Sequence, residues 1–184
     1  MKNELQELQK IHGDIFTVDI TNKTGKSLTS YIKNGNVKKK KEIFASVGDD
    51  NYFDLAEDYI KENFVGGDNI IEDDEALFSI CTQFKDLFSF DAAKLIKVPK
   101  DLDAGFGIES GDFKAYFKID VAVKKKLFKL VTRGITDGFV LGEIIIHEAF
   151  VSGDDLTIDE NIFASASLLA SKQADLDDVV IKKN

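Results

Sequence analysis

His147 is the residue whose type best suits acid–base chemistry, because an imidazole changes its charge near neutral pH. It stands in the run GEIIIHEAF, whose continuous apolar character predicts a buried strand. On a strand, Glu143 and His147 share a face but lie roughly 13 Å apart, and Glu148 points to the opposite face. A catalytic His147 would therefore need a carboxylate from another strand. The alternative, which the sequence favours, is a structural histidine bonded to a backbone group near the strand end.

The stretch TNKTGKSLTS, residues 21–30, contains Gly-Lys-Ser, the end of a phosphate-binding loop. Such a loop needs another glycine where this chain has Ile20, and a helix must follow so that its N–H groups face the phosphate. The following SLTSYI favours a strand. We therefore expect a hairpin turn in which Gly25 takes the left-handed conformation, and no nucleotide site.

Motifs for cofactors and metals are also incomplete. GFGIESG has Ser110 where a dinucleotide fingerprint needs its third glycine, and the acidic stretches lack the spacing of a calcium loop. Cys81 is the one cysteine, so neither an intrachain disulfide nor a cysteine-rich metal site is possible. It falls in an apolar helical stripe and is predicted to be buried. We expect no cofactor and no metal.

Charge is strongly segregated along this 184-residue chain of net charge −9. Residues 49–75 hold eleven acids and one lysine, residues 114–133 hold seven basic residues and one acid, and residues 137–160 hold seven acids without lysine or arginine. Segregation of this kind predicts solvated faces of opposite sign, or faces complementary to a partner. The overall acidity argues against a general nucleic-acid binder.

Two groups of lysines are candidates for partner binding. The segment KNGNVKKKK contributes Lys38, Lys39, Lys40 and Lys41, which could contact phosphates. It offers no aromatic residue or arginine for reading bases, and lysines on an edge strand also prevent strand pairing. The second group alternates with apolar residues in DFKAYFKIDVAVK and is predicted to share the exposed face of one strand. Its members are Lys114, Lys118 and Lys124.

The elements that carry these residues predict an α+β fold, because helical and strand patterns are segregated along the chain. The predicted helices cover residues 3–11, 49–67, 72–88 and 161–174. The predicted strands form an N-terminal three-strand meander, with a turn at Asn34-Gly35, and a C-terminal antiparallel sheet. They cover residues 14–20, 27–32, 41–47, 112–124, 126–133, 139–151 and 156–158. The tail, 175–184, is expected to be an edge strand or disordered.

The length predicts a single domain over 1–184, with a possible subdomain division near 91–107. The N-terminus has no apolar signal core and no run approaches the ~18 apolar residues of a membrane span, so a cytoplasmic protein without a membrane partner is expected. The sequence favours a non-enzymatic interaction or assembly protein that binds a protein partner or itself, such as a virion, mobile-element or regulatory component. Two alternatives stay open. One is a small enzyme or ligand-binding protein that uses His147 with a nearby carboxylate, and the other is a nucleic-acid-associated protein that uses residues 38–41.

Overall fold

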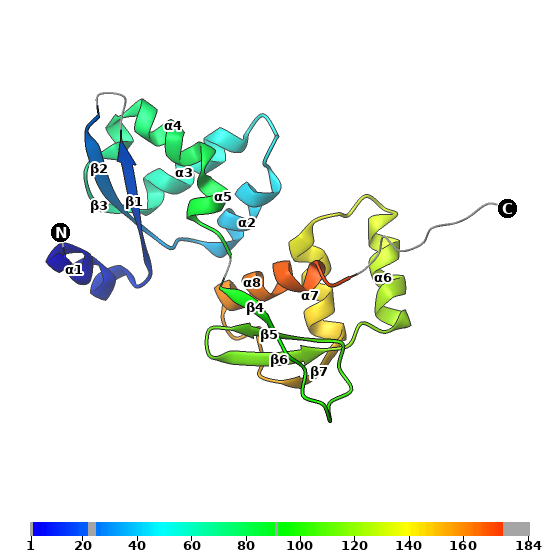
Figure 1. Ribbon diagram of the computed structural model, residues 1–184. Coiled ribbons are helices and arrows are strands. Elements are labelled where there is room, and N and C mark those ends of the chain that lie inside the picture. Colours follow the sequence, from blue (N-terminus) through cyan, green and yellow to red (C-terminus); the bar gives the residue numbers. More distant parts are fainter. Residues whose placement is uncertain (1, 22–24, 91, 175–184) are drawn as a thin grey trace. The chain divides into compact units, whose positions relative to one another are not determined.

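The computed structural model describes residues 2–21, 25–90 and 92–174, and the chain divides into two compact units. Unit 1 is Met1–Ser89 and unit 2 is Phe90–Asn184. Each unit has its own antiparallel sheet (Figure 1). The strand order in unit 1 is β1 (Ile15–Thr21), β2 (Ser27–Lys33), β3 (Phe64–Gly67), and in unit 2 it is β4 (Ala93–Ile96), β5 (Phe106–Ser110), β6 (Phe113–Phe117), β7 (Phe150–Gly153). The fold is α+β, as predicted: a three-stranded sheet with helices, followed by a second antiparallel sheet and a final helix.

Unit 1 is built on two long paired strands. β1 and β2 pair antiparallel from Ile15↔Lys33 to Thr21↔Ser27, and Gly25 between them has φ 80°, the predicted left-handed conformation. The third strand, β3, joins β2 on its other edge with a register shift between Tyr31 and Ile32. The elements are α1 (Lys2–His12), β1 (Ile15–Thr21), β2 (Ser27–Lys33), α2 (Val37–Ala45), α3 (Tyr52–Asn63), β3 (Phe64–Gly67), the short 3₁₀ helix η1 (Ile70–Glu72), α4 (Asp74–Thr82) and α5 (Phe84–Leu87).

The prediction of a strand over 41–47 is wrong, because this segment belongs largely to helix α2. The side chain of Asn36 accepts a hydrogen bond from the Lys39 backbone N–H at 3.1 Å, which starts the helix instead of a hairpin turn. The buried positions of α2 follow helical spacing and include a lysine, Lys40. The sheet takes its third strand from residues after α3 instead.

Aromatic rings fill the core of unit 1. Tyr59, Phe84 and Phe88 are fully buried, and the Tyr59 ring meets both phenylalanine rings edge-on at 5.2 and 5.8 Å. The Tyr59 hydroxyl accepts a hydrogen bond from the Gly35 backbone N–H at 2.9 Å, which ties α3 to the chain before α2. Cys81 is buried here as predicted, and burial raises the pKa of its thiol to about 11.

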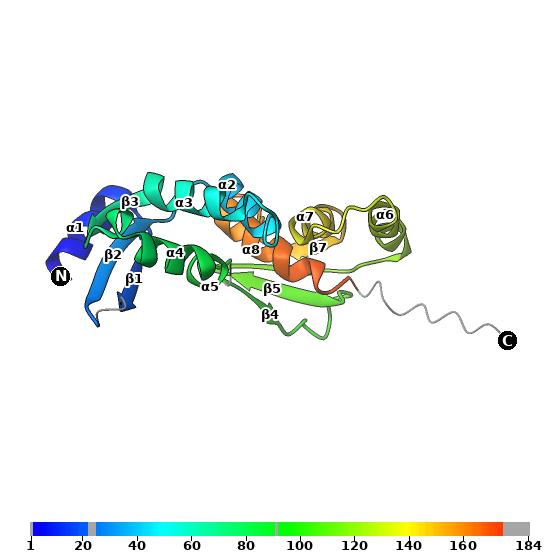
Figure 2. The ribbon, with the colours of Figure 1, turned by 90° about the horizontal axis from the view of Figure 1, so that it is seen from above.

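Unit 2 places two helices against its sheet and a third helix outside them. α8 packs on β4, β5 and α7, and α6 packs on α7 at the outer edge of the unit (Figures 1 and 2). The elements are β4 (Ala93–Ile96), β5 (Phe106–Ser110), β6 (Phe113–Phe117), α6 (Val121–Val131), α7 (Gly138–Glu148), β7 (Phe150–Gly153) and α8 (Glu160–Ser171).

Three predicted strands of unit 2 differ from the structure because two aspartates, Asp120 and Asp137, start helices that cover most of these residues. The strand predicted over 112–124 ends at Phe117, and the Asp120 side chain accepts from the Val123 backbone N–H at 2.9 Å to begin α6. The Asp137 side chain accepts from the Phe139 backbone N–H at 2.7 Å to begin α7. The strands predicted over 126–133 and 139–151 are therefore wrong for most of their length. Residues 156–158 form a turn, not a strand, and the tail 175–184 lies outside the described residues.

Helices α7 and α8 approach each other unusually closely. A side-chain carbon added at Gly142 would lie 1.8 Å from the backbone carbonyl oxygen of Ser167. The buried residues of α8 are all small, namely Ala164, Ser165, Ala166, Ser167 and Ala170. The two backbones thus contact each other almost directly, and this pair of helices covers the sheet.

Candidate functional site

Helix α6 exposes apolar and basic side chains together. Val121 is 67% exposed and Phe128 is 60% exposed, and because they stand seven residues apart they lie on the same side of the helix. The exposed lysines around them complete what we call the α6 face. Its members are Val121, Lys124, Lys125, Phe128 and Lys129.

The opposite side of α6 holds the helix in place. Val123 and Leu127 are buried in the unit 2 core, and the Lys126 ammonium pairs with Glu148 of α7 at 2.6 Å. The Asp120 cap fixes where the helix begins. These contacts hold the α6 face in a defined orientation toward solvent.

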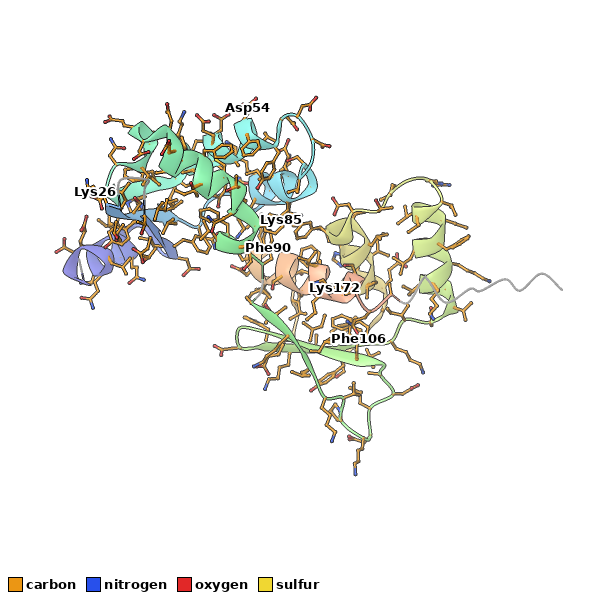
Figure 3. All side chains as sticks on the ribbon, turned by 45° about the horizontal axis from the view of Figure 1, so that its top comes forward. Lys26, Asp54, Lys85, Phe90, Phe106 and Lys172 are labelled. Carbon is orange, nitrogen blue, oxygen red and sulfur yellow. The ribbon has the colours of Figure 1, made fainter. Side chains whose placement is uncertain are left out.

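A second unusual surface lies on unit 1, where two phenylalanine rings are stacked in the open. Phe53 of α3 is 41% exposed and Phe78 of α4 is 58% exposed, and their ring centres are 5.1 Å apart at an interplanar angle of 11°. Exposed acids lie near these rings in the sequence: Asp54 follows Phe53 at the surface of α3 (Figure 3), and Asp74 and Glu75 precede Phe78 by about one turn of α4. We call this surface the α3–α4 patch. Its members are Phe53, Asp54, Asp74, Glu75 and Phe78.

The α3–α4 patch borders a hollow of about 520 Å³ between the end of β1 and the start of α4. Phe78 forms part of its wall, together with the apolar side chains of Ile20 and Ala76. Asp74 and Glu75 add carboxylates at the same place. The hollow is lined by Ile20, Thr21, Asp74, Glu75, Ala76, Phe78 and Ser79. It therefore combines an apolar surface with negative charge, which suits a side chain or segment that is both apolar and basic.

His147 lines a third surface feature, a hollow of about 340 Å³ in unit 2. It stands in the last turn of α7, and its ring centre lies 5.4 Å from that of Phe163. The other residues around the hollow come mainly from β7 and the loop after it. They are Phe117, Ile146, Phe150, Gly153, Asp154, Asp155, Leu156 and Thr157.

Asp155 is the carboxylate best placed to act with His147. Its Oδ1 accepts hydrogen bonds from the Thr157 hydroxyl at 2.6 Å and from the Thr157 backbone N–H at 2.8 Å. These hydrogen bonds, followed by the charge of nearby His147, lower the pKa of Asp155. The neighbouring Asp154 accepts from the Lys114 backbone N–H at 2.8 Å and so anchors the loop to β6.

The carboxylates named from the sequence occupy other places. Glu143 and His147 lie one helical turn apart on α7, so the predicted separation of four strand steps is wrong. Glu148 is engaged by Lys126. Sequence reasoning missed Asp154 and Asp155. The available signal was the Asp-x-Thr pattern of residues 155–157, because an aspartate followed two residues later by threonine commonly closes a local turn.

The lysines of α2 do not form one exposed row. Lys38 is exposed, whereas the Lys39 ammonium pairs with Glu62 at 2.6 Å and Lys41 is half-buried. Lys40 is only 1% exposed, with its ammonium 5.6 Å from the centre of the Phe16 ring. A phosphate backbone could not reach Lys40 in this fold.

The prediction that Lys114, Lys118 and Lys124 share one strand face is wrong. Lys114 is on β6 and pairs with Glu109 at 3.2 Å, whereas Lys118 follows the strand and pairs with Asp103 at 2.5 Å. Lys124 belongs to α6. The basic surface of unit 2 therefore centres on the α6 face, and sequence reasoning missed its apolar members, Val121 and Phe128.

Comparisons of the chain with protein-family models, with curated proteins and with solved structures find no match. Within residues 2–21, 25–90 and 92–174, no helix combines the length and apolar character needed to cross a bilayer. The same described part contains no cluster of three or more histidine, cysteine, aspartate or glutamate side chains able to hold a metal ion.

Proposed function

We propose that this protein is a non-enzymatic interaction protein that docks its α6 face onto an acidic protein surface. The observation that carries the proposal is the exposure of Phe128 and Val121 among three lysines on one rigid helix face. Helices commonly bind a groove through apolar residues at such spacing, and aromatic anchors contribute much of the binding energy. The lysines would speed encounter and set the orientation of the complex.

Other classes of partner fit the α6 face less well. It has no arginine for recognising bases and one aromatic ring, and the net charge of −9 repels a polyanion. A lipid surface would gain little, because this helix of eleven residues exposes only two large apolar side chains within the α6 face. A protein surface with carboxylates around an apolar depression satisfies both kinds of side chain.

Photo-crosslinking can test this docking directly. A photoreactive phenylalanine analogue in place of Phe128 should give strong adducts in host cells, and the same analogue in place of Leu95 should give few. Leu95 is a matched control because it is 49% exposed on β4 of the same unit. Mass spectrometry should place the adducts from position 128 in peptides that combine acidic and apolar residues. Equal labelling from both positions, or adducts in peptides without acids, would contradict the proposal.

A second candidate function is supported by the hollow at His147. An imidazole beside an ionised carboxylate can act as a general base, with the carboxylate orienting the ring. We propose, as the alternative to docking, that this hollow binds a small ester or amide, for which His147 removes a proton from the attacking water.

The hydrolysis of p-nitrophenyl acetate distinguishes this alternative from simple histidine reactivity. If His147 is catalytic, replacing it with asparagine should lower the rate about a hundredfold. The matched control is His12→Asn, which removes an exposed histidine from α1 and should leave the rate unchanged. Equal rates for the two variants, or a wild-type rate no higher than that of free imidazole, would exclude the alternative.

A further inference from the structure

We infer that the acidic surface bound by the α6 face is the α3–α4 patch of a second copy of this chain. The inference rests on the proposed function and names its partner. Both halves of the interface would then be present on every molecule. The protein would associate with copies of itself in a head-to-tail manner.

The apolar parts of the two surfaces match in kind. The α6 face offers one protruding aromatic side chain, Phe128, beside the smaller Val121. The α3–α4 patch offers the stacked rings of Phe53 and Phe78 next to a hollow of about 520 Å³. A hollow of this volume lies in the range of about 300–1,000 Å³ that holds small molecules, so it has room for an aromatic side chain. One contact would cover three exposed phenylalanine rings.

The charges match in sign as well. Lys124, Lys125 and Lys129 surround the aromatic anchor on α6, whereas acids surround the rings on α3 and α4. The residues 49–75 that contain most of the patch hold eleven acids and one lysine, and the residues 114–133 that contain α6 hold seven basic residues and one acid. The lysines of the α6 face would therefore neutralise the carboxylates of the α3–α4 patch when the contact excludes water.

The same charges exclude a symmetric contact between like surfaces. Two α6 faces brought together would place lysines against lysines, and two α3–α4 patches would place carboxylates against carboxylates. Only the unlike pair is favourable, so each contact joins the α6 face of one copy to the α3–α4 patch of another. Successive copies then form a closed ring or an open chain, depending on the rotation between neighbours.

Mixing two complementary variants tests this interface. Phe128→Ser removes the anchor and keeps the patch, and Phe78→Ser damages the patch and keeps the anchor. In sedimentation velocity, the wild-type full chain should grow in mass with concentration and return to monomer in high salt. Each variant alone should stay monomeric, whereas an equimolar mixture should form a one-to-one dimer through the single intact pair of surfaces. Leu95→Ser is the control and should associate as the wild type does.

A charge-swap pair keeps the test valid if either serine variant fails to fold. Lys125→Glu and Asp74→Lys each reverse one exposed charge, so each alone should weaken association and the mixture should restore it. Self-association is overturned if the wild type is monomeric across the concentration series. This interface is overturned if the wild type associates but neither mixture does, or if the single variants associate normally. If the wild type is monomeric but position 128 still crosslinks to acidic peptides of another protein, the proposed function stands and only self-association is rejected. If the wild type is monomeric and position 128 gives no such crosslinks, both the proposed function and self-association are rejected.

Discussion

Replacing Gly142 with alanine is expected to lower the free energy of unfolding by about 3 kcal/mol. The new methyl group would lie 1.8 Å from the carbonyl oxygen of Ser167 and 2.3 Å from its carbonyl carbon. Both atoms belong to the α8 backbone and cannot rotate away, so α7 and α8 would have to separate along the contact that covers the sheet. Urea unfolding followed by circular dichroism measures the effect.

Gly138→Ala is the matched control for this substitution, because Gly138 starts the same helix and faces α8 too. Its methyl group would lie 3.2 Å from the Ser171 hydroxyl and 3.3 Å from a Leu168 methyl, which are side-chain atoms that can shift. Alanine also has the higher helix propensity, so we expect a change below about 1 kcal/mol. Similar losses for the two variants would show that the close approach of α7 and α8 is not as described.

Replacing Lys40 with methionine is expected to stabilise the protein by about 1–2 kcal/mol at pH 7. Burial lowers the pKa of Lys40 from 10.5 to about 8, so the folded state holds its charged form at a cost. This difference in pKa between the folded and unfolded states corresponds to roughly 3 kcal/mol. The substitution also removes the ring contact with Phe16 and the 3.2 Å hydrogen bond to Asn34 Oδ1, and these losses offset part of the gain. Thermal unfolding measures the change.

The same substitution should alter how stability depends on pH. Between pH 8 and 10.5 the unfolded chain keeps the Lys40 proton while the folded chain releases it, so the Lys40 contribution to stability should rise through this window. The buried Cys81 thiol, whose pKa is raised from 9.0 to about 11, contributes the opposite slope from about pH 9 upward in wild type and variant alike. The Lys40 contribution should disappear in Lys40→Met. The exposed neighbour gives the control, since Lys38→Met should change stability by less than about 0.5 kcal/mol and keep the pH dependence. A less stable Lys40→Met at pH 7, or an unchanged slope, would contradict the prediction.

Whether an element of this fold could be predicted from the sequence depends on how that element is buried. β1 and α3 have one buried and one exposed side, so their periods are readable and both were predicted. α7 is packed by α6, α8 and β7, and a continuous apolar run reads the same for a buried strand and a buried helix. The isoleucines at 144–146 then favoured a strand by propensity. The decisive signals were the helix caps Asp120 and Asp137, which are single residues that also suit turns.

The candidate site shows the same limit. His147 could be singled out by its chemistry, but its position beside the same hollow as Asp155 depends on β7 turning back from the end of α7, which no local pattern encodes. Phe78 was detectable in principle, because it falls outside the buried stripe of α4 that contains Leu77, Ile80 and Cys81. Exposure of Phe128 was hidden by the incorrect strand prediction over 126–133. When the side-chain period of a strand is assumed for a helix, residues are assigned to the wrong side of the element.

Because Cys81 is buried, the alkylation of its thiol can measure local unfolding of the wild-type chain. Its thiol is the only one in the sequence, and a pKa of about 11 leaves almost no thiolate at neutral pH. Alkylating dyes should therefore react only when the region around α4 opens, at a rate set by that local equilibrium. A cysteine engineered on the surface could be labelled with a fluorophore or spin probe while the native thiol stays silent, with no need to remove it first.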